Sequence, residues 1–384
     1  MKVAHLRMIV AACAASLGTY ACTDTAPTEP VSPKVSASVV GGGIKTLSVS
    51  NSGPVRLHGG GALGSTHTYA MFWGTAWNTD TAFTGDRITA MNSLLEGFGG
   101  SDYAYILTEY GVTTQSTHIS TMIDNSPAPT GDPLSAGLGS YVCSRLTATH
   151  HTPDFNAIYI VYVTTPEPGS ESGWHSTALC ASIRIHTVLV FLVSNVGEPQ
   201  LYHSRAANGM AQITAHEIAE TITDENLGGG WYVTDPSNSE IADKCGFAPT
   251  VYVTLHNGVK FLLPQLWSNF AFSKGTGAPG ANNEKGCVSS GVQWPHASVS
   301  GPAFARQYQA NTYTATVTGG RAPYTYNWYF SSGVPTFVLP TGTGPSFTTT
   351  LYGWPTGQPE TLFTAISDAD GRQMSVATSV TSTS

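Results

Sequence analysis

One short segment carries residue types that can bind a metal ion and use it. His216 and Glu220 are four positions apart, so on a helix they lie one above the other on the same face. This spacing suits two ligands of one cation. The adjacent Glu217 would sit beside the cation, where a carboxylate can take a proton from a bound water. The pattern follows the His-Glu-x-x-His zinc helix, with Glu220 in place of the second histidine.

A third ligand must come from outside this helix, because a catalytic zinc ion usually has three protein ligands and a water. Glu240 and Asp243 lie a short loop downstream, and Cys245 could anchor them there if it is disulfide-bonded. We favour Glu240 as the ligand, and Asp243 as the residue that holds His216 by its other ring nitrogen. Two further carboxylates are held in reserve, Asp224 and Asp235.

The donor set affects which metal is expected. One imidazole and two carboxylates form a harder, more anionic set than two imidazoles and one carboxylate. Zinc is the first expectation, and calcium or manganese also suits these donors. Extra negative charge weakens the pull of the metal on its water, so either the activity is modest or the ion is structural. The alternative is that the pattern marks only a solvated polar helix face.

Other candidate residues are weaker. Residues 169–173 have no serine at their centre, so they do not form a nucleophile elbow. His175 and His203 are left out of the site, because a lone histidine is more often a hydrogen-bonded structural residue.

The elements that must position the site form an α/β (α+β) domain, expected over residues 54–292. The metal helix should cover residues 209–224 and end before three glycines. Asp86 can cap a second helix, whose apolar stripe ends at Gly99 and Gly100. Residues 157–163 and 185–193 are typical of central strands in a covered sheet. We therefore predict a zincin-like domain built around the metal helix.

The C-terminal residues 298–384 have the pattern of an all-β sandwich. Alternating apolar positions indicate strands, and residues 368–371 mark a turn between two of them. Trp328 occupies the place of a buried core tryptophan, as in immunoglobulin-like (Ig-like) or PKD-type modules.

The first 22 residues resemble a signal peptide, with a short basic start and an apolar run. Cys22 suits a lipoprotein start, so lipid anchoring and simple secretion are equally expected. Residues 23–53, rich in Pro, Ser, Thr and Gly, should form a disordered linker. An extracellular or cell-envelope location follows, with no membrane-spanning segment.

The composition argues against nucleic acid as a partner, and the cysteine count suggests disulfide bonds. Charged residues make up 10% of the chain and the net charge is -8, so no basic stripe is present to bind nucleic acid. Four cysteines remain after the signal region, and they allow three pairings. We favour Cys143 with Cys180 and Cys245 with Cys287, because each bond then closes a loop within one half of the domain.

Residues 55–288 resemble the phosphate-induced, EXORDIUM-like family of extracellular proteins. The similarity rests on Leu57-His58-Gly59-Gly60, on Ala215-His216-Glu217-Ile218-Ala219-Glu220, on residues 240–245, and most specifically on residues 257–267. The resemblance implies an extracellular location, linked in plants to the cell wall and growth. It places His216, Glu217, Glu220, Glu240 and Asp243 on the family's own His-Glu-Leu-Ala-Glu and Glu-x-x-Asp-x-Cys pattern. The Ig-like tail lies outside it.

The sequence supports two hypotheses about function, one for an enzyme and one for a binding protein. The first is a secreted or envelope-anchored metal-dependent hydrolase, in its simplest form a peptidase acting on a peptide or cell-wall substrate, with Glu217 as the base. The second is a non-catalytic extracellular protein that binds cell-wall glycan or a protein partner.

Overall fold

The structure, a computed structural model, describes residues 35–37, 52–128, 133–164, 172–191, 201–234, 239–246, 248–331, 342–352, 356–357 and 359–384. Several sequence predictions lie outside these residues: the signal peptide, Cys22, most of the linker, and the reserve ligand Asp235.

A six-stranded sheet, in the order β1-β6-β7-β5-β3-β4, organises the α/β region. Its strands are β1 (Val35–Ala37), β3 (Thr66–Trp73), β4 (Ser116–Asp124), β5 (Ala157–Val163), β6 (Gly173–Cys180) and β7 (Ile183–Val190). Strands β4, β3, β5 and β7 run parallel to one another. Strand β6 runs antiparallel to β7, and β1 pairs antiparallel with β6. The strands predicted at residues 157–163 and 185–193 are confirmed as β5 and β7. Strand β7 begins two residues earlier than expected, and residues 192–193 lie outside the described part.

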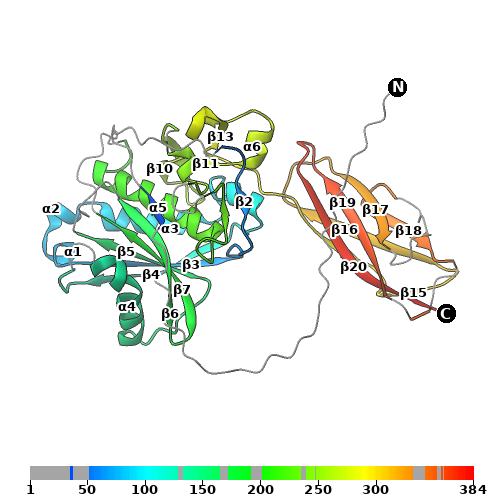
Figure 1. Cartoon of the computed structure of the whole chain (residues 1–384), viewed down its shortest axis with the longest axis horizontal. Coiled ribbons are helices and arrows are strands. Elements are labelled where there is room, and N and C mark those ends of the chain that lie inside the picture. The colour runs from blue at the N-terminus through cyan, green and yellow to red at the C-terminus, as the bar shows by residue number, and fades with distance from the viewer. Residues whose placement is uncertain are drawn as a thin grey trace. The chain divides into compact units, whose positions relative to one another are not determined.

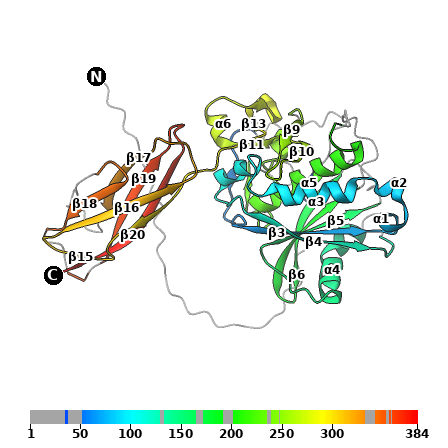
Figure 2. The same ribbon diagram turned by 180° about the vertical axis from the view of Figure 1, so that it is seen from behind.

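Helices cover both faces of this sheet. Helices α3 (Arg87–Phe98) and α5 (Arg205–Thr223) pack on one face, against alternate side chains such as Ile158 and Ile160. Helix α4 (Pro133–Ala148) packs on the other, against Tyr159 and Val161. Figures 1 and 2 show these layers from opposite sides. With both faces covered, β5 is buried at every position, which explains its uninterrupted apolar sequence.

The remaining elements of the α/β region are short. They are α1 (Ala76–Thr79), α2 (Thr81–Thr84), η2 (Ala104–Tyr110), η3 (Asp243–Cys245), α6 (Asn269–Ser273), η4 (Ala281–Asn283), β2 (Arg56–Leu57), β8 (Trp231–Tyr232), β9 (Val251–Thr254), β10 (Lys260–Leu263), β11 (Leu266–Trp267), β12 (Ala278–Pro279) and β13 (Lys285–Val288).

The start of α5 differs from the prediction. The helix begins at Arg205, four residues before Gly209, and the Ser204 hydroxyl caps it by accepting a hydrogen bond from the Ala207 N–H. Asp86 was expected to cap α3, but its side chain makes no capping bond there. Its carboxylate instead accepts hydrogen bonds from the Ser204 N–H and hydroxyl. Asp86 therefore fixes the beginning of α5.

The C-terminal region is all β. One sheet contains β14 (His296–Ser300), β16 (Ala310–Thr318) and β18 (Ser346–Thr350). The other contains β15 (Phe304–Arg306), β20 (Gln373–Thr383), β19 (Pro359–Ser367) and β17 (Thr325–Ser331). Trp328 is fully buried in their core, and its indole N–H donates to the Gly344 carbonyl. Residues 368–371 connect β19 to β20, as predicted.

Both favoured disulfides are present. Cys143 is bonded to Cys180 and Cys245 to Cys287, with Cα–Cα distances of 5.5 and 5.6 Å that are normal for a disulfide. Two such bonds indicate an oxidising, extracellular setting. Among the described helices, none combines the length and apolar character needed to cross a membrane.

Candidate metal centre

Helix α5 is enclosed on all sides. All its residues from Ala207 to Thr223 are buried, including Glu217 and Glu220, which have no solvent exposure. Buried carboxylates need a compensating partner, because the loss of water around an unpaired charge costs several kcal/mol or more. The helix ends at Thr223, and the carboxylate of the next residue, Asp224, accepts hydrogen bonds from the Gly228 and Gly230 N–H groups. The reserve ligand Asp224 is thus occupied in closing the helix.

One group of donors forms around His216. Its Nε2 lies 3.1 Å from Oε1 of Glu220 and 3.5 Å from Oδ1 of Asp243. Ligand atoms about 2.1 Å from a tetrahedral zinc ion lie about 3.4 Å apart, so these separations suit one cation. The group retains some access to solvent, because the His216 and Asp243 side chains are 10% and 12% exposed. We call His216, Glu220 and Asp243 the outer group.

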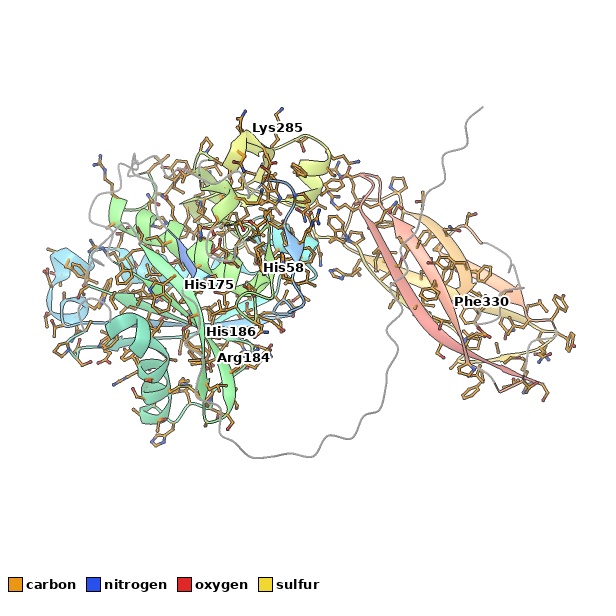
Figure 3. All side chains as sticks on the ribbon, in the orientation of Figure 1. His58, His175, Arg184, His186, Lys285 and Phe330 are labelled. Atoms are coloured by element: carbon orange, nitrogen blue, oxygen red, sulfur yellow. A yellow bond between two sulfur atoms is a disulfide. The ribbon has the colours of Figure 1, made fainter. Side chains whose placement is uncertain are left out.

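A second group contains His175, which sequence reasoning left out. This residue lies on β6 (Figure 3) and is 1% exposed. Its Nε2 is 3.8 Å from Oε2 of Glu240, and its Nδ1 is 3.9 Å from Oε2 of Glu220. Candidate ligand atoms of these three residues all lie within 4.8 Å of one another. We call His175, Glu220 and Glu240 the inner group.

The structure therefore arranges the downstream acids differently from the preferred prediction. Asp243, not Glu240, joins His216 and Glu220, while Glu240 faces His175. Glu217 is also engaged, since its Oε2 lies 3.1 Å from Nδ1 of His175. All five predicted site residues nevertheless belong to one continuous cluster.

Gly173 allows β6 to bring His175 close to helix α5. A Cβ at this position would overlap Cγ2 of Ile213 and lie 2.8 Å from the Leu189 carbonyl oxygen. Only a residue without a side chain lets the strand and helix approach this closely.

The loop that carries Glu240 and Asp243 is fixed at several points. The Asp243 N–H donates to Oε1 of Glu220 at 3.0 Å, and the Trp267 N–H donates to the Ile241 carbonyl at 2.7 Å. Cys245 is bonded to Cys287. The buried Lys244 ammonium pairs with Glu284 at 3.1 Å and lies 4.0 Å from the centroid of the Trp267 ring. These contacts hold the two acids against α5.

The electrostatics of the cluster favour bound protons or a cation. Burial alone would lower the pKa of His216, but the nearby carboxylates of Glu220 and Asp243 outweigh it and hold the pKa well above its usual value. For His175, burial is likewise outweighed, first by the hydrogen bond to Glu217, so its pKa is raised. Burial, reinforced by Glu220, raises the pKa of Glu240 well above normal. A metal ion would replace these protons, so binding should release them.

The polar atoms that remain without partners fit a cation. Within the described part of the chain, several buried atoms have no hydrogen-bond partner: Nε2 of His175, Nε2 of His216, Oε2 of Glu220, both carboxylate oxygens of Glu240 and Oδ2 of Asp243. Unsatisfied buried groups are rare in native proteins. These atoms belong to the residues of the two groups, and all are of the type that binds metal ions.

His175 could not be identified from its sequence neighbourhood. The strand pattern places Gly173 and His175 on the same face of β6, yet nothing local indicates that this face meets α5. The other histidine left out, His203, lies apart from the cluster; its ring stacks on Phe261 at 4.3 Å and its Nδ1 lies 3.8 Å from Asp86.

No protein-family model matches the chain, and no curated protein matches it. The chemistry of the buried cluster therefore carries the functional conclusion.

Proposed function

We propose that this protein is an exported metal-dependent hydrolase with a zincin-like site, in its simplest form a peptidase. The observation that carries the proposal is the convergence of His216 Nε2, Glu220 Oε1 and Asp243 Oδ1 at separations suited to one ion. Zinc is the expected metal, and calcium or manganese is compatible with the carboxylate-rich donors. When bound, such an ion would polarise a carbonyl and acidify a water molecule.

Glu217 is the proposed general base. It follows His216 directly on α5, and the bond between its Oε2 and His175 fixes the orientation of its carboxylate. A base must be held within reach of the proton that it removes. In this arrangement His216, Glu220 and Asp243 would hold the cation, Glu217 would take up the proton, and His175 positions Glu217.

An extended peptide is the substrate that best suits the surroundings. Strand β6 carries His175 and is paired on its outer side with β1, at Val35–Ala37 opposite Gly173–His175. This edge thus already pairs with an extended segment of the chain itself, and a peptide substrate would bind there in place of β1. Addition of a strand to a sheet edge is a general way to bind peptides through main-chain hydrogen bonds.

The test combines metal analysis with two variants of Glu217. Purified protein should contain zinc or another divalent ion in stoichiometric amount and cleave members of a broad peptide library. Glu217→Gln keeps an acceptor for His175 but cannot act as a base, so the metal should stay and cleavage should fall by at least about a hundredfold. Glu217→Ala should also lose cleavage. The matched control is Glu96→Gln on the exposed face of α3, which should change nothing. Full turnover by Glu217→Gln would refute the assigned role.

A second candidate is a non-catalytic envelope protein that binds cell-wall glycan or a protein partner. The observation that favours it is the enclosure of the site: Glu217, Glu220 and Glu240 have no exposure, and His175 has 1%. A structural ion needs no route for a substrate. Stoichiometric metal without turnover of any library peptide, together with a loss of thermal stability on chelation, would support this candidate over the hydrolase.

Membership of the EXORDIUM-like family is part of the proposal, as is a β-sandwich of Ig-like or PKD type at the C-terminus. The family is supported by the motif residues His216 to Glu220 and Glu240 to Cys245, which meet in one cluster. A zincin-like fold is supported by the position of the metal helix beneath a sheet whose strand β6 runs antiparallel to β7. We also propose an extracellular or envelope location, with either secretion or lipid attachment at Cys22.

A further inference from the structure

Glu220 lies between the two histidines of the cluster. Its Oε1 is 3.1 Å from Nε2 of His216, whereas its Oε2 is 3.9 Å from Nδ1 of His175. Oε1 thus belongs to the outer group, whereas Oε2 lies on the side of His175 and has no hydrogen-bond partner among the described residues. Ligand atoms of His175, Glu220 and Glu240 lie within 4.8 Å of one another. A carboxylate in this position can bind two cations, one through each oxygen, as in the two-metal sites of many hydrolases.

Glu240 supplies a second, independent observation. It has no solvent exposure, and within the described residues neither of its oxygens has a hydrogen-bond partner. Its neighbour across the inner group is Nε2 of His175, at 3.8 Å, which is too far for a hydrogen bond. Both residues therefore carry buried, unsatisfied ligand atoms 3.8 Å apart, and a cation bound by both would satisfy them.

The other ring nitrogen of His175 is oriented for this role. Nδ1 lies 3.1 Å from Oε2 of Glu217, so a proton on Nδ1 is bonded to a carboxylate and the lone pair of Nε2 faces Glu240. Metal-binding histidines are commonly held by a carboxylate in this way, which fixes the tautomer and makes the free nitrogen a better ligand.

The charges of the cluster match two divalent cations. The four carboxylates are those of Glu217, Glu220, Glu240 and Asp243, and the two imidazoles can be neutral. One divalent ion would leave two negative charges in a largely buried volume, and bound protons would have to neutralise them. Two divalent ions balance the four carboxylates.

We propose that the protein binds two divalent cations bridged by Glu220. The outer ion is held by His216, Asp243 and Oε1 of Glu220; the inner ion is held by His175, Glu240 and Oε2 of Glu220. The inference deepens the proposed function and rests on it, because the outer ion is the one assigned to hydrolysis. The two proposed ions differ in their access to solvent. The residues of the inner group are at most 1% exposed, whereas His216 and Asp243 of the outer group reach solvent. The inner ion should exchange more slowly.

Metal stoichiometry of the full-length protein tests the proposal. Apoprotein is prepared with a strong chelator and loaded with Zn²⁺ or Mn²⁺, and bound metal is measured by mass spectrometry after gel filtration. We expect two ions in the wild type, and one in each of the variants Glu240→Gln and Asp243→Asn. Mn²⁺-loaded wild type should also give a spin-coupled electron paramagnetic resonance signal, which each variant converts to that of an isolated ion. Glu96→Gln should bind two ions.

Each outcome has a defined meaning. One ion in the wild type that is lost in Asp243→Asn but kept in Glu240→Gln refutes the inner ion and leaves the proposed function standing. No bound ion refutes both proposals. Two ions in Glu240→Gln refute the assigned position of the second ion. Circular dichroism and thermal melting of each apoprotein check folding. If Glu240→Gln fails to fold, His175→Gln provides the same test from strand β6, with one ion expected and two refuting the proposal.

Discussion

The disulfide between Cys245 and Cys287 should hold the ligand loop in place in addition to stabilising the fold. Replacing both cysteines by alanine separates these effects. The bond joins residues 42 positions apart, and the chain-entropy relation gives about 4 kcal/mol for a loop of this length at 25 °C. Cys143 and Cys180 are 37 positions apart, which also gives about 4 kcal/mol. Removing either bond should therefore lower the stability of the fold by a similar amount.

Their expected effects on metal binding differ. Cys245 follows Asp243 by two residues and Glu240 by five. Without the bond the loop keeps its other anchors, such as the pair between Lys244 and Glu284, so it should loosen without being released. Ordering the backbone of one residue costs about 1–2 kcal/mol, and 1.4 kcal/mol corresponds to tenfold in affinity. We therefore expect metal affinity to fall about tenfold or more.

The control variant, Cys143→Ala with Cys180→Ala, should lose similar stability but keep its metal affinity, because strand β6 remains paired with β7 along its length. Denaturant unfolding in the presence of a chelator measures the stability of each apoprotein. Competition with a chromophoric chelator, at temperatures where both variants are folded, measures the affinity for zinc. The reasoning is refuted if the variant without Cys245 and Cys287 binds zinc as tightly as the wild type. An equal loss of zinc affinity in both double variants would also refute it, because the cause would then be general destabilisation of the fold.

Three further predictions concern residues around the cluster. Burial lowers the pKa of His186 to about 4; stability present above pH 6.5 should therefore fall by about 3 kcal/mol as the pH drops to 4, and His186→Leu should flatten this dependence in urea titrations. Gly173→Ala should lower the stability of the fold by about 1–3 kcal/mol through overpacking and should weaken metal binding. The control is Gly137→Ala on α4, where a Cβ meets nothing; it should leave metal binding unchanged and raise stability by up to about 1 kcal/mol. Lys244→Met should cost about 2–3 kcal/mol by removing the ammonium that neutralises Glu284, whose side chain would then keep, among the described residues, only its hydrogen bond from the Gly53 N–H. Adding Glu284→Gln should recover part of that loss; equal stability of the single and double variants would argue against the ion pair.

Several features could be predicted from the sequence because they depend on local spacing. The buried strand at residues 157–163 and the turn at residues 368–371 follow from side-chain periodicity. His216 and Glu220 share a helix face because they are four residues apart. The pairing of the four cysteines was also predicted correctly, from the principle that each bond closes a loop within one half of the domain.

Other features depended on contacts between distant segments. The start of α5 moved to Arg205 because Asp86, more than a hundred residues earlier, binds Ser204. The choice between Glu240 and Asp243 depended on how the loop after β8 folds against α5, where the Asp243 N–H reaches Glu220. Each of these contacts joins residues whose local sequence carries no information about the other.

The sequence by itself determined that a helix would present His216, Glu217 and Glu220, because helical periodicity is an intrinsic property of the backbone. Only the tertiary structure decided that His175 completes the cluster. A strand residue can face either side of a sheet, and shifting the pairing by one residue reverses that choice. The packing of β6 on α5 at Gly173 made the choice, and so placed a second histidine beside the buried carboxylates.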